Sequence, residues 1–156
     1  MRIADIKFND IVDGEGICVS VWFQGCPHHC LGCHNPGTWD FNGGYEIEYQ
    51  ELKRQVLEGL NQNNVLRNLS LLGGEPLCEE NIHYACDLAA AAKEKYPNVK
   101  VYCWTGSTYE VIKNKYGEEV FKNIDILIDG PFILKQRDLS LFLRGSKNQR
   151  VLKLKE

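Results

Sequence analysis

The sequence lacks long apolar runs and any excess of positive charge. Its longest apolar runs fall far short of the roughly 18 residues that a membrane-spanning helix needs. The start, Met1–Asp5, does not supply the apolar core of a secretory signal peptide. The formal net charge is −3, which gives no electrostatic footprint for nucleic acid. We therefore expect a cytoplasmic protein that binds neither membrane nor nucleic acid.

Repeats, low-complexity segments and interdomain linkers are also missing from the 156 residues. A chain of this length is most simply one domain, and it can bury a substantial hydrophobic core. We therefore predict that residues 1–156 form a single domain.

Cysteine is the residue type that stands out. Seven cysteines without a secretory signal favour a reducing compartment and metal binding over disulfides. Cys26, Cys30 and Cys33 form the spacing C-x3-C-x2-C in the cysteine loop, residues 24–35. The remaining cysteines have no second cysteine at ligand spacing and are predicted to be structural: Cys18, Cys78, Cys86 and Cys103.

Three thiolates are one fewer than the four that usually close an iron–sulfur cluster. An iron without a protein thiolate can bind another molecule, and the chemistry is expected there. The alternative is a closed zinc site in which His28, His29 or His34 supplies the fourth ligand. Structural zinc sites usually combine two separate knuckles, so the single contiguous loop favours iron–sulfur.

The hydrophobic pattern predicts strands that alternate with helices, hence an α/β fold with a mostly parallel sheet. Strands are predicted at 3–8, 17–23, 69–72, 99–104, 124–128 and 151–154. Helices are predicted at 46–62, at 79–95 with Glu79 and Glu80 in the first turn, and from a Ser107/Glu110 capping box to Lys115. The face of the second helix that contains Ile82, Ala85, Cys86, Ala89 and Ala90 is predicted to be buried. Four helix-linked strands are too few for an eight-stranded barrel, so the barrel should be partial and open.

Glycine follows each of the four predicted parallel strands, at Gly25, Gly73-Gly74, Gly106 and Gly130. The carboxyl ends of parallel strands share one edge, where ligands of such sheets bind. Bare backbone at all four ends therefore predicts a single site. By contrast, spacing alone predicts that Asp13-Gly14-Glu15-Gly16 is a plain turn.

The cysteine spacing followed by Gly73-Gly74-Glu75-Pro76 resembles the radical S-adenosylmethionine (SAM) enzymes. Within them, the chain is most similar to the activating proteins of anaerobic ribonucleoside-triphosphate reductases. The resemblance extends over nearly the whole chain, through these motifs: 13–16, the cysteine loop with Asn35 and Trp39, 73–76, 104–106, 129–132 and 144–150.

The resemblance implies a partial β/α barrel of the radical SAM type and the following chemistry. Cys26, Cys30 and Cys33 hold a 4Fe-4S cluster whose fourth iron binds SAM. A flavodoxin or ferredoxin reduces the cluster, and the electron cleaves SAM to methionine and a 5′-deoxyadenosyl radical. That radical takes a hydrogen atom from a glycine of the large subunit of the reductase. A homodimer and a heterotetramer with the reductase are both left open.

The resemblance also assigns cofactor contacts. Gly73 and Gly74 are expected to face the methionine end of SAM, with Glu75 as an acceptor for its ammonium group. Gly32, Cys33 and His34 are candidates for the adenosyl part. An apolar shell from Trp22, Phe23 and Leu31 is expected around the cluster.

Four points stay open at this stage. Thr105 and Asp129 either bind SAM or cap turns, and the Arg144–Arg150 segment either faces solvent or meets the partner. The substrate could belong to another radical SAM enzyme, such as a pyruvate formate-lyase activase or a carboxy-deazaguanine synthase. A zinc-binding adaptor without catalysis is the alternative from another class.

Overall fold

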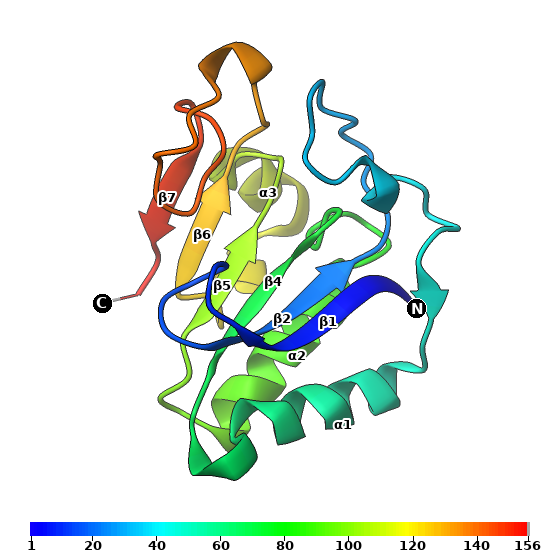
Figure 1. Cartoon of the computed structure of the whole chain (residues 1–156), viewed down its shortest axis with the longest axis vertical. Coiled ribbons are helices and arrows are strands. Elements are labelled where there is room, and N and C mark those ends of the chain that lie inside the picture. Colours follow the sequence, from blue (N-terminus) through cyan, green and yellow to red (C-terminus); the bar gives the residue numbers. More distant parts are fainter. Residues whose placement is uncertain (156) are drawn as a thin grey trace.

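The computed structural model describes residues 1–155, which form one seven-stranded sheet with three α-helices (Figure 1). The strand order is β3-β1-β2-β4-β5-β6-β7. The central strands β2, β4, β5 and β6 are parallel, whereas β1, β3 and β7 pair antiparallel at the two edges. The sheet stays open, which confirms the predicted α/β class and agrees with a partial barrel.

The predicted elements are present with shifted ends. The strands are β1 Arg2–Asp10, β2 Cys18–Phe23, β3 Tyr45–Glu46, β4 Asn68–Gly73, β5 Val101–Trp104, β6 Ile126–Asp129 and β7 Arg150–Lys153. The α-helices are α1 Tyr49–Leu60, α2 Ile82–Lys95 and α3 Tyr109–Tyr116. Short 3-10 turns lie at Pro36–Thr38, Gln62–Asn64, Glu118–Phe121 and Leu134–Gln136.

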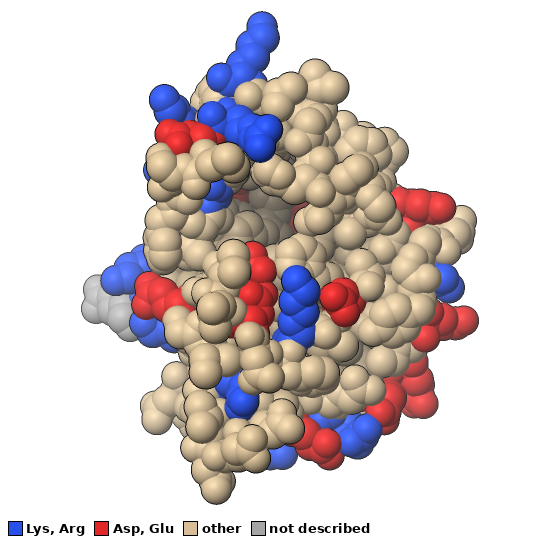
Figure 2. All heavy atoms as spheres, in the orientation of Figure 1, with Lys and Arg blue, Asp and Glu red and all other residues tan. Residues whose placement is uncertain are grey.

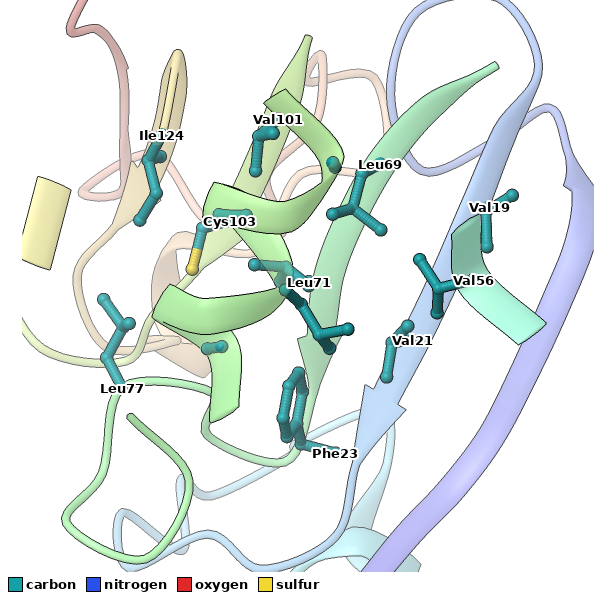
Figure 3. Close-up of a cluster of buried hydrophobic side chains, with 14 of the residues drawn as sticks. Val19, Val21, Phe23, Val56, Leu69, Leu71, Leu77, Val101, Cys103 and Ile124 are labelled. Carbon is teal, nitrogen blue, oxygen red and sulfur yellow. The ribbon is translucent and has the colours of Figure 1, made fainter. Parts of the chain in front are cut away.

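The main core lies between the sheet and the helices. Strand side chains alternate between two faces, and on β2 the residues Val19, Val21 and Phe23 point into this core (Figure 3). Leu69 and Leu71 of β4 join them, as do residues from α1 and α2. This burial fixes the register of each strand, because a slip of one residue would turn the apolar set outward.

The remaining side chains of the strands lie on the opposite face of the sheet. Tyr102, Ile126 and Ile128 form a second, smaller buried cluster there, packed against Trp104 and Leu143. Trp22 and Leu72 alternate with core residues of their strands and line a cavity with Trp104. The open side of the sheet is therefore the side on which a ligand can be enclosed.

Two helix starts differ from the prediction. Helix α2 begins at Ile82, so Glu79 and Glu80 precede it; the Leu77 N–H donates to the Glu75 carboxylate and fixes a turn there. In α3, Thr108 rather than Ser107 is the N-cap, because Thr108 Oγ1 accepts a hydrogen bond from the Val111 N–H. The two-residue strand β3 gave no sequence signal.

The buried face of α2 also differs in part. Ala85 and Ala89 are buried as predicted, but the rest of the buried stripe is Leu88 and Ala92. Ile82, Cys86 and Ala90 are only half-buried. No described helix combines the length and apolar composition needed to cross a membrane.

Candidate functional site

A cavity of about 430 Å³ opens at the carboxyl ends of the parallel strands. Cys26, Cys30 and Cys33 line it, and so do Gly73 and Gly74 after β4. The sequence put these residues at one edge of the sheet, and the structure brings them to one cavity. Figure 2 shows the molecular surface hollowed near this end of the molecule.

The cysteine loop is shaped by backbone hydrogen bonds. The Gly25 N–H donates to the Thr38 carbonyl (2.7 Å), and the Cys26 N–H donates to the Trp39 carbonyl (3.2 Å). Gly25 has a φ of +100°, and a Cβ at this position would collide with the ring of Phe41. Only glycine meets both conditions, so these contacts fix the start of the cysteine loop.

The glycine turn, Gly73-Gly74-Glu75, is bonded directly to the start of the cysteine loop. The Gly74 N–H donates to the Phe23 carbonyl (3.0 Å), and the Glu75 N–H donates to the Gly25 carbonyl (2.8 Å). A Cβ on Gly74 would lie 2.5 Å from the Gly25 oxygen. The two motifs that the sequence identified 47 residues apart therefore form one hydrogen-bonded frame.

The Glu75 carboxylate lies inside this frame, with only 1% of the residue exposed. Its Oε1 accepts from His28 Nε2 (2.6 Å), from Thr105 Oγ1 (2.9 Å) and from the Gly106 N–H (2.8 Å), while Oε2 accepts from the Leu77 N–H (2.9 Å). The hydrogen bond that His28 donates to the Glu75 carboxylate is the main reason why the pKa of His28 is raised. The carboxylate thus joins the cysteine loop to the ends of β4 and β5.

The three histidines near the cysteines each have another partner. His28 binds Glu75, the ring of His29 stacks on Trp39 at 4.7 Å, and His34 tilts against Phe132 at 5.3 Å. Among the described residues, no three His, Cys, Asp or Glu side chains converge as ligands of one metal ion. A Cys3His zinc site therefore has no fourth ligand in place, whereas the three thiolates of a cluster bind three different irons.

The donor set fits an iron–sulfur cluster. All three cysteines are free and half-buried at the cavity wall. Burial raises the pKa of the Cys26 thiol to about 11, and the charge of Glu75 adds to the shift. A thiol must lose its proton to bind iron, so the metal has to displace that proton when it binds.

Two tryptophans in the cavity wall hold unused hydrogen-bond donors. The indole nitrogens of Trp22 and Trp39 are buried and have no acceptor within residues 1–155. A buried N–H without a partner is costly, so such donors indicate that something else completes them. Cluster sulfides and the polar groups of SAM are acceptors, and the walls fit an occupant of this kind.

The expected apolar shell is only partly present. Trp22 lines the cavity, but Phe23 points into the core on the other face of the sheet, and Leu31 is 79% exposed. The prediction failed at Phe23 because sequence neighbours on a strand alternate between faces, and at Leu31 because the turn of the cysteine loop leaves this side chain in solvent.

The residues beside the last cysteine lie in different surroundings. His34 lines the cavity. Gly32, with a φ of +78°, packs instead on a later segment, where a Cβ would lie 2.7 Å from Leu134 Cδ1. Gly32 therefore brings the cysteine loop against residues 133–147.

Asp13 is a cavity residue that sequence reasoning missed. Its carbonyl accepts a hydrogen bond from Ser70 Oγ, and the residue lines the cavity. Burial, followed by a hydrogen bond to the Asp10 carboxylate, raises the pKa of Asp13 to about 7. Spacing alone predicts a plain turn for the Asp-Gly-Glu-Gly segment; both of its glycines, Gly14 and Gly16, have positive φ, and its first residue, Asp13, lines the cavity.

The residues left open by the sequence have defined partners. Thr105 donates to Glu75, and the buried Asp129 accepts from the Tyr109 N–H (2.7 Å) and from Arg150 Nε (2.9 Å). Arg150 also binds Glu110, and Arg144 lines the cavity while it donates to the Gln149 carbonyl (2.6 Å). Thr105 therefore lies in the cavity wall, whereas Asp129 and Arg150 support the site from outside the cavity.

Comparison with known proteins agrees with this geometry. Residues 12–152 match a family model described as a 4Fe-4S single cluster domain. Proteins named anaerobic ribonucleoside-triphosphate reductase-activating protein are similar along most of the chain. Those of Vibrio cholerae and Escherichia coli K12 are each 33% identical over 90% of both chains, and that of Pasteurella multocida is 34% identical over 90% of this chain and 89% of its own.

The chain belongs to this family of reductase-activating proteins. The matched span, residues 12–152, includes every cavity residue, from Asp13 to Gln149. The cofactors of this activating protein are therefore a 4Fe-4S cluster and, as the enzyme class implies, SAM.

Proposed function

We propose that this protein activates the anaerobic ribonucleoside-triphosphate reductase. The observation that carries the proposal is the meeting of three free cysteines and a glycine turn in one cavity, in a chain of the activating-protein family. When bound, the reduced cluster supplies the electron that cleaves SAM and so provides the radical that is transferred to a glycine of the reductase. The chain itself binds, orients and shields these groups.

Individual residues have the following proposed roles. Cys26, Cys30 and Cys33 hold the cluster, and the backbone of Gly73 and Gly74 receives the ammonium end of SAM. Glu75 contributes a buried negative charge beneath that ammonium; its present partners, His28 and Thr105 among them, support an indirect role. His34 lines the cavity and supports an adenosyl contact, while Gly32 permits the close packing behind it.

The surroundings of the reaction are part of the proposal. We expect one domain over residues 1–156, since the main core draws on α1, α2, α3 and most strands. The electron donor is proposed to be a flavodoxin or a ferredoxin, and the protein is proposed to work in the cytoplasm. Assembly as a homodimer, or as a heterotetramer with the reductase, is consistent with the open sheet and remains a prediction.

A count of iron and acid-labile sulfide tests the cluster. Protein reconstituted without air should hold about four of each per chain. Cys26→Ala should lose the cluster. Cys86→Ala is the matched control and should retain it, because Cys86 lies on α2 with its Sγ near the Val120 carbonyl, away from the cavity. One tightly held zinc ion and no sulfide would overturn the proposal.

Glycyl-radical formation tests the activity. Reduced protein with SAM should produce a glycyl radical on the anaerobic reductase, detected by electron paramagnetic resonance. A competent reductase that acquires no radical from fully loaded protein would direct attention to another glycyl radical enzyme, such as a pyruvate formate-lyase, as the substrate.

A further inference from the structure

An ordered lobe beside the cavity carries unpaired basic groups. We call residues 133–147 the basic lobe; it follows β6 and returns to β7. Backbone bonds from the Asp138 N–H to the Gly145 carbonyl (3.1 Å) and from the Lys147 N–H to the Gln136 carbonyl (2.9 Å) close it. Its conformation is thus fixed by internal hydrogen bonds.

The lobe has a net positive charge, whereas the chain as a whole is negatively charged. The whole chain has a formal net charge of −3, yet the lobe holds Lys135, Arg137, Arg144 and Lys147 against one acidic residue, Asp138. Within residues 1–155 no carboxylate forms an ion pair with Lys135, Arg137 or Lys147, and all three are exposed. Figure 2 shows basic side chains gathered at this end of the molecule, above the hollow.

Large apolar side chains accompany these cations. Leu139 is 79% exposed and Phe142 is 60% exposed at the tip of the lobe, and Leu134 is 42% exposed at its base. Exposed apolar groups within a polar rim are typical of a surface that binds a partner. The core does not need these side chains, since they contribute to neither buried cluster.

The lobe is continuous with the reaction site. Leu143, Arg144 and Gly145 line the cavity, and Leu134 packs on Gly32 of the cysteine loop. A cavity of about 430 Å³ is near the lower end of the range for a single small-molecule ligand, so a folded protein cannot enter it. A protein substrate can insert only one extended segment, and its remaining surface must rest on the rim.

We propose that the basic lobe is the docking surface for the reductase, and that it binds an acidic, partly apolar region that flanks the target glycine. This inference rests on the proposed function, because the occupant is the protein on which the radical is formed. Opposite charges steer the encounter, and Leu139 and Phe142 supply the apolar anchors. No atom of the lobe takes part in the electron or hydrogen transfer.

Charge reversal on the lobe is the test. We compare Lys135→Glu/Arg137→Glu with Lys100→Glu/Lys122→Glu, a control pair of exposed lysines that precede β5 and β6 at the opposite edge of the sheet. Glycyl-radical formation is measured against reductase concentration at low and high salt. The lobe variant should raise the KM for reductase about tenfold and flatten its salt dependence, while the control pair leaves both unchanged.

Two further measurements distinguish docking of the reductase from binding of the cluster and SAM. Iron content and SAM cleavage by dithionite-reduced protein, both without reductase, should equal those of the wild type in the lobe variant. Leu139→Ser/Phe142→Ser keeps the charges of the lobe, so it should raise the same KM by a factor that changes little with salt. An unchanged KM in both variants overturns the docking surface, whereas a wild type that forms no glycyl radical overturns the proposed function instead.

A second copy of this chain is the competing occupant. Sedimentation of wild type and lobe variant decides between them. If the variant turns a wild-type dimer into a monomer while the KM for reductase stays the same, the lobe is a self-association surface and the proposal is wrong.

Discussion

The Glu75 carboxylate connects the parts of the site through its hydrogen bonds. A carboxylate with four donors, taken from the cysteine loop, its own turn and the end of β5, is a structural anchor as well as a charge. It makes the position of the cysteines depend on the position of the glycine turn. The spacing between the cysteine loop and the glycine turn is therefore set by hydrogen bonds inside the protein.

Replacement of this carboxylate should destabilise the apo protein. Glu75→Gln places an NH2 group against N–H donors and removes the charge that holds His28. We expect a loss of about 2–4 kcal/mol in the free energy of unfolding, measured with urea, since a buried charged hydrogen bond is broken. Glu79→Gln, at an exposed neighbour, should change it by less than about 0.5 kcal/mol. Equal effects of the two variants would contradict the anchoring role.

Trp39→Phe should act in opposite directions on the empty and the loaded protein. The phenyl ring keeps the stack on His29 but removes an indole N–H that has no acceptor. Unfolding of the apo protein should therefore need the same or a higher urea concentration. SAM binding or cluster retention should weaken about tenfold, because the donor meets its acceptor only there. A variant that unfolds at a lower urea concentration and also binds SAM or the cluster more weakly would show that the N–H has a purely structural role.

At the scale of elements, His28 lies across the end of β5. A Cβ on Gly106 would lie 2.5 Å from His28 Cδ2, so the ring occupies the space that a side chain would take. The glycine after β5 thus permits close packing of the cysteine loop, and it also lines the cavity as the sequence predicted.

A double-mutant cycle tests this contact. Gly106→Ala should displace His28 from Glu75 and lower the free energy of unfolding by about 1–3 kcal/mol. In a His28→Ala background the same change should cost much less, because the clash is gone. Gly37→Ala is the control, since a Cβ there has no neighbour within 4 Å. Additive losses in the double variant would mean that the two residues do not interact.

The elements show what could be predicted and what could not. The helix–strand alternation and the glycines at the strand ends are local signals, so the parallel core, the cysteine loop and their common edge followed from the sequence. The partners of Glu75 lie 47 and 30 residues away, at His28 and Thr105, and no local pattern encodes such distances. The basic lobe has no hydrophobic period, because backbone turns rather than core packing hold it.

At the scale of the whole molecule, stability should depend on pH through Asp13. Its pKa of about 7 exceeds the ordinary value near 4, so the folded state binds a proton that the unfolded state has released between these values. The contribution of Asp13 to stability is therefore fully present at low pH and declines as pH rises from about 4 through 7. Asp13→Asn can still donate to Asp10 and should flatten this decline.

Urea unfolding at pH 5 and pH 8 measures the effect. The wild type should lose more free energy of unfolding between these pH values than Asp13→Asn does. Asp13→Ala should be less stable than Asp13→Asn at both, since alanine offers Asp10 no donor. A wild type and an Asp13→Asn variant with the same pH dependence would contradict the carboxyl–carboxylate pair.

The hydrogen-bonded frame of cysteine loop, glycine turn and Glu75 has one more consequence. Its bonds run between protein groups only, so the chain itself holds the cysteine loop and the glycine turn together. We therefore expect protein that has lost its cluster to oxygen to regain it on reconstitution with iron and sulfide, without prior unfolding and refolding.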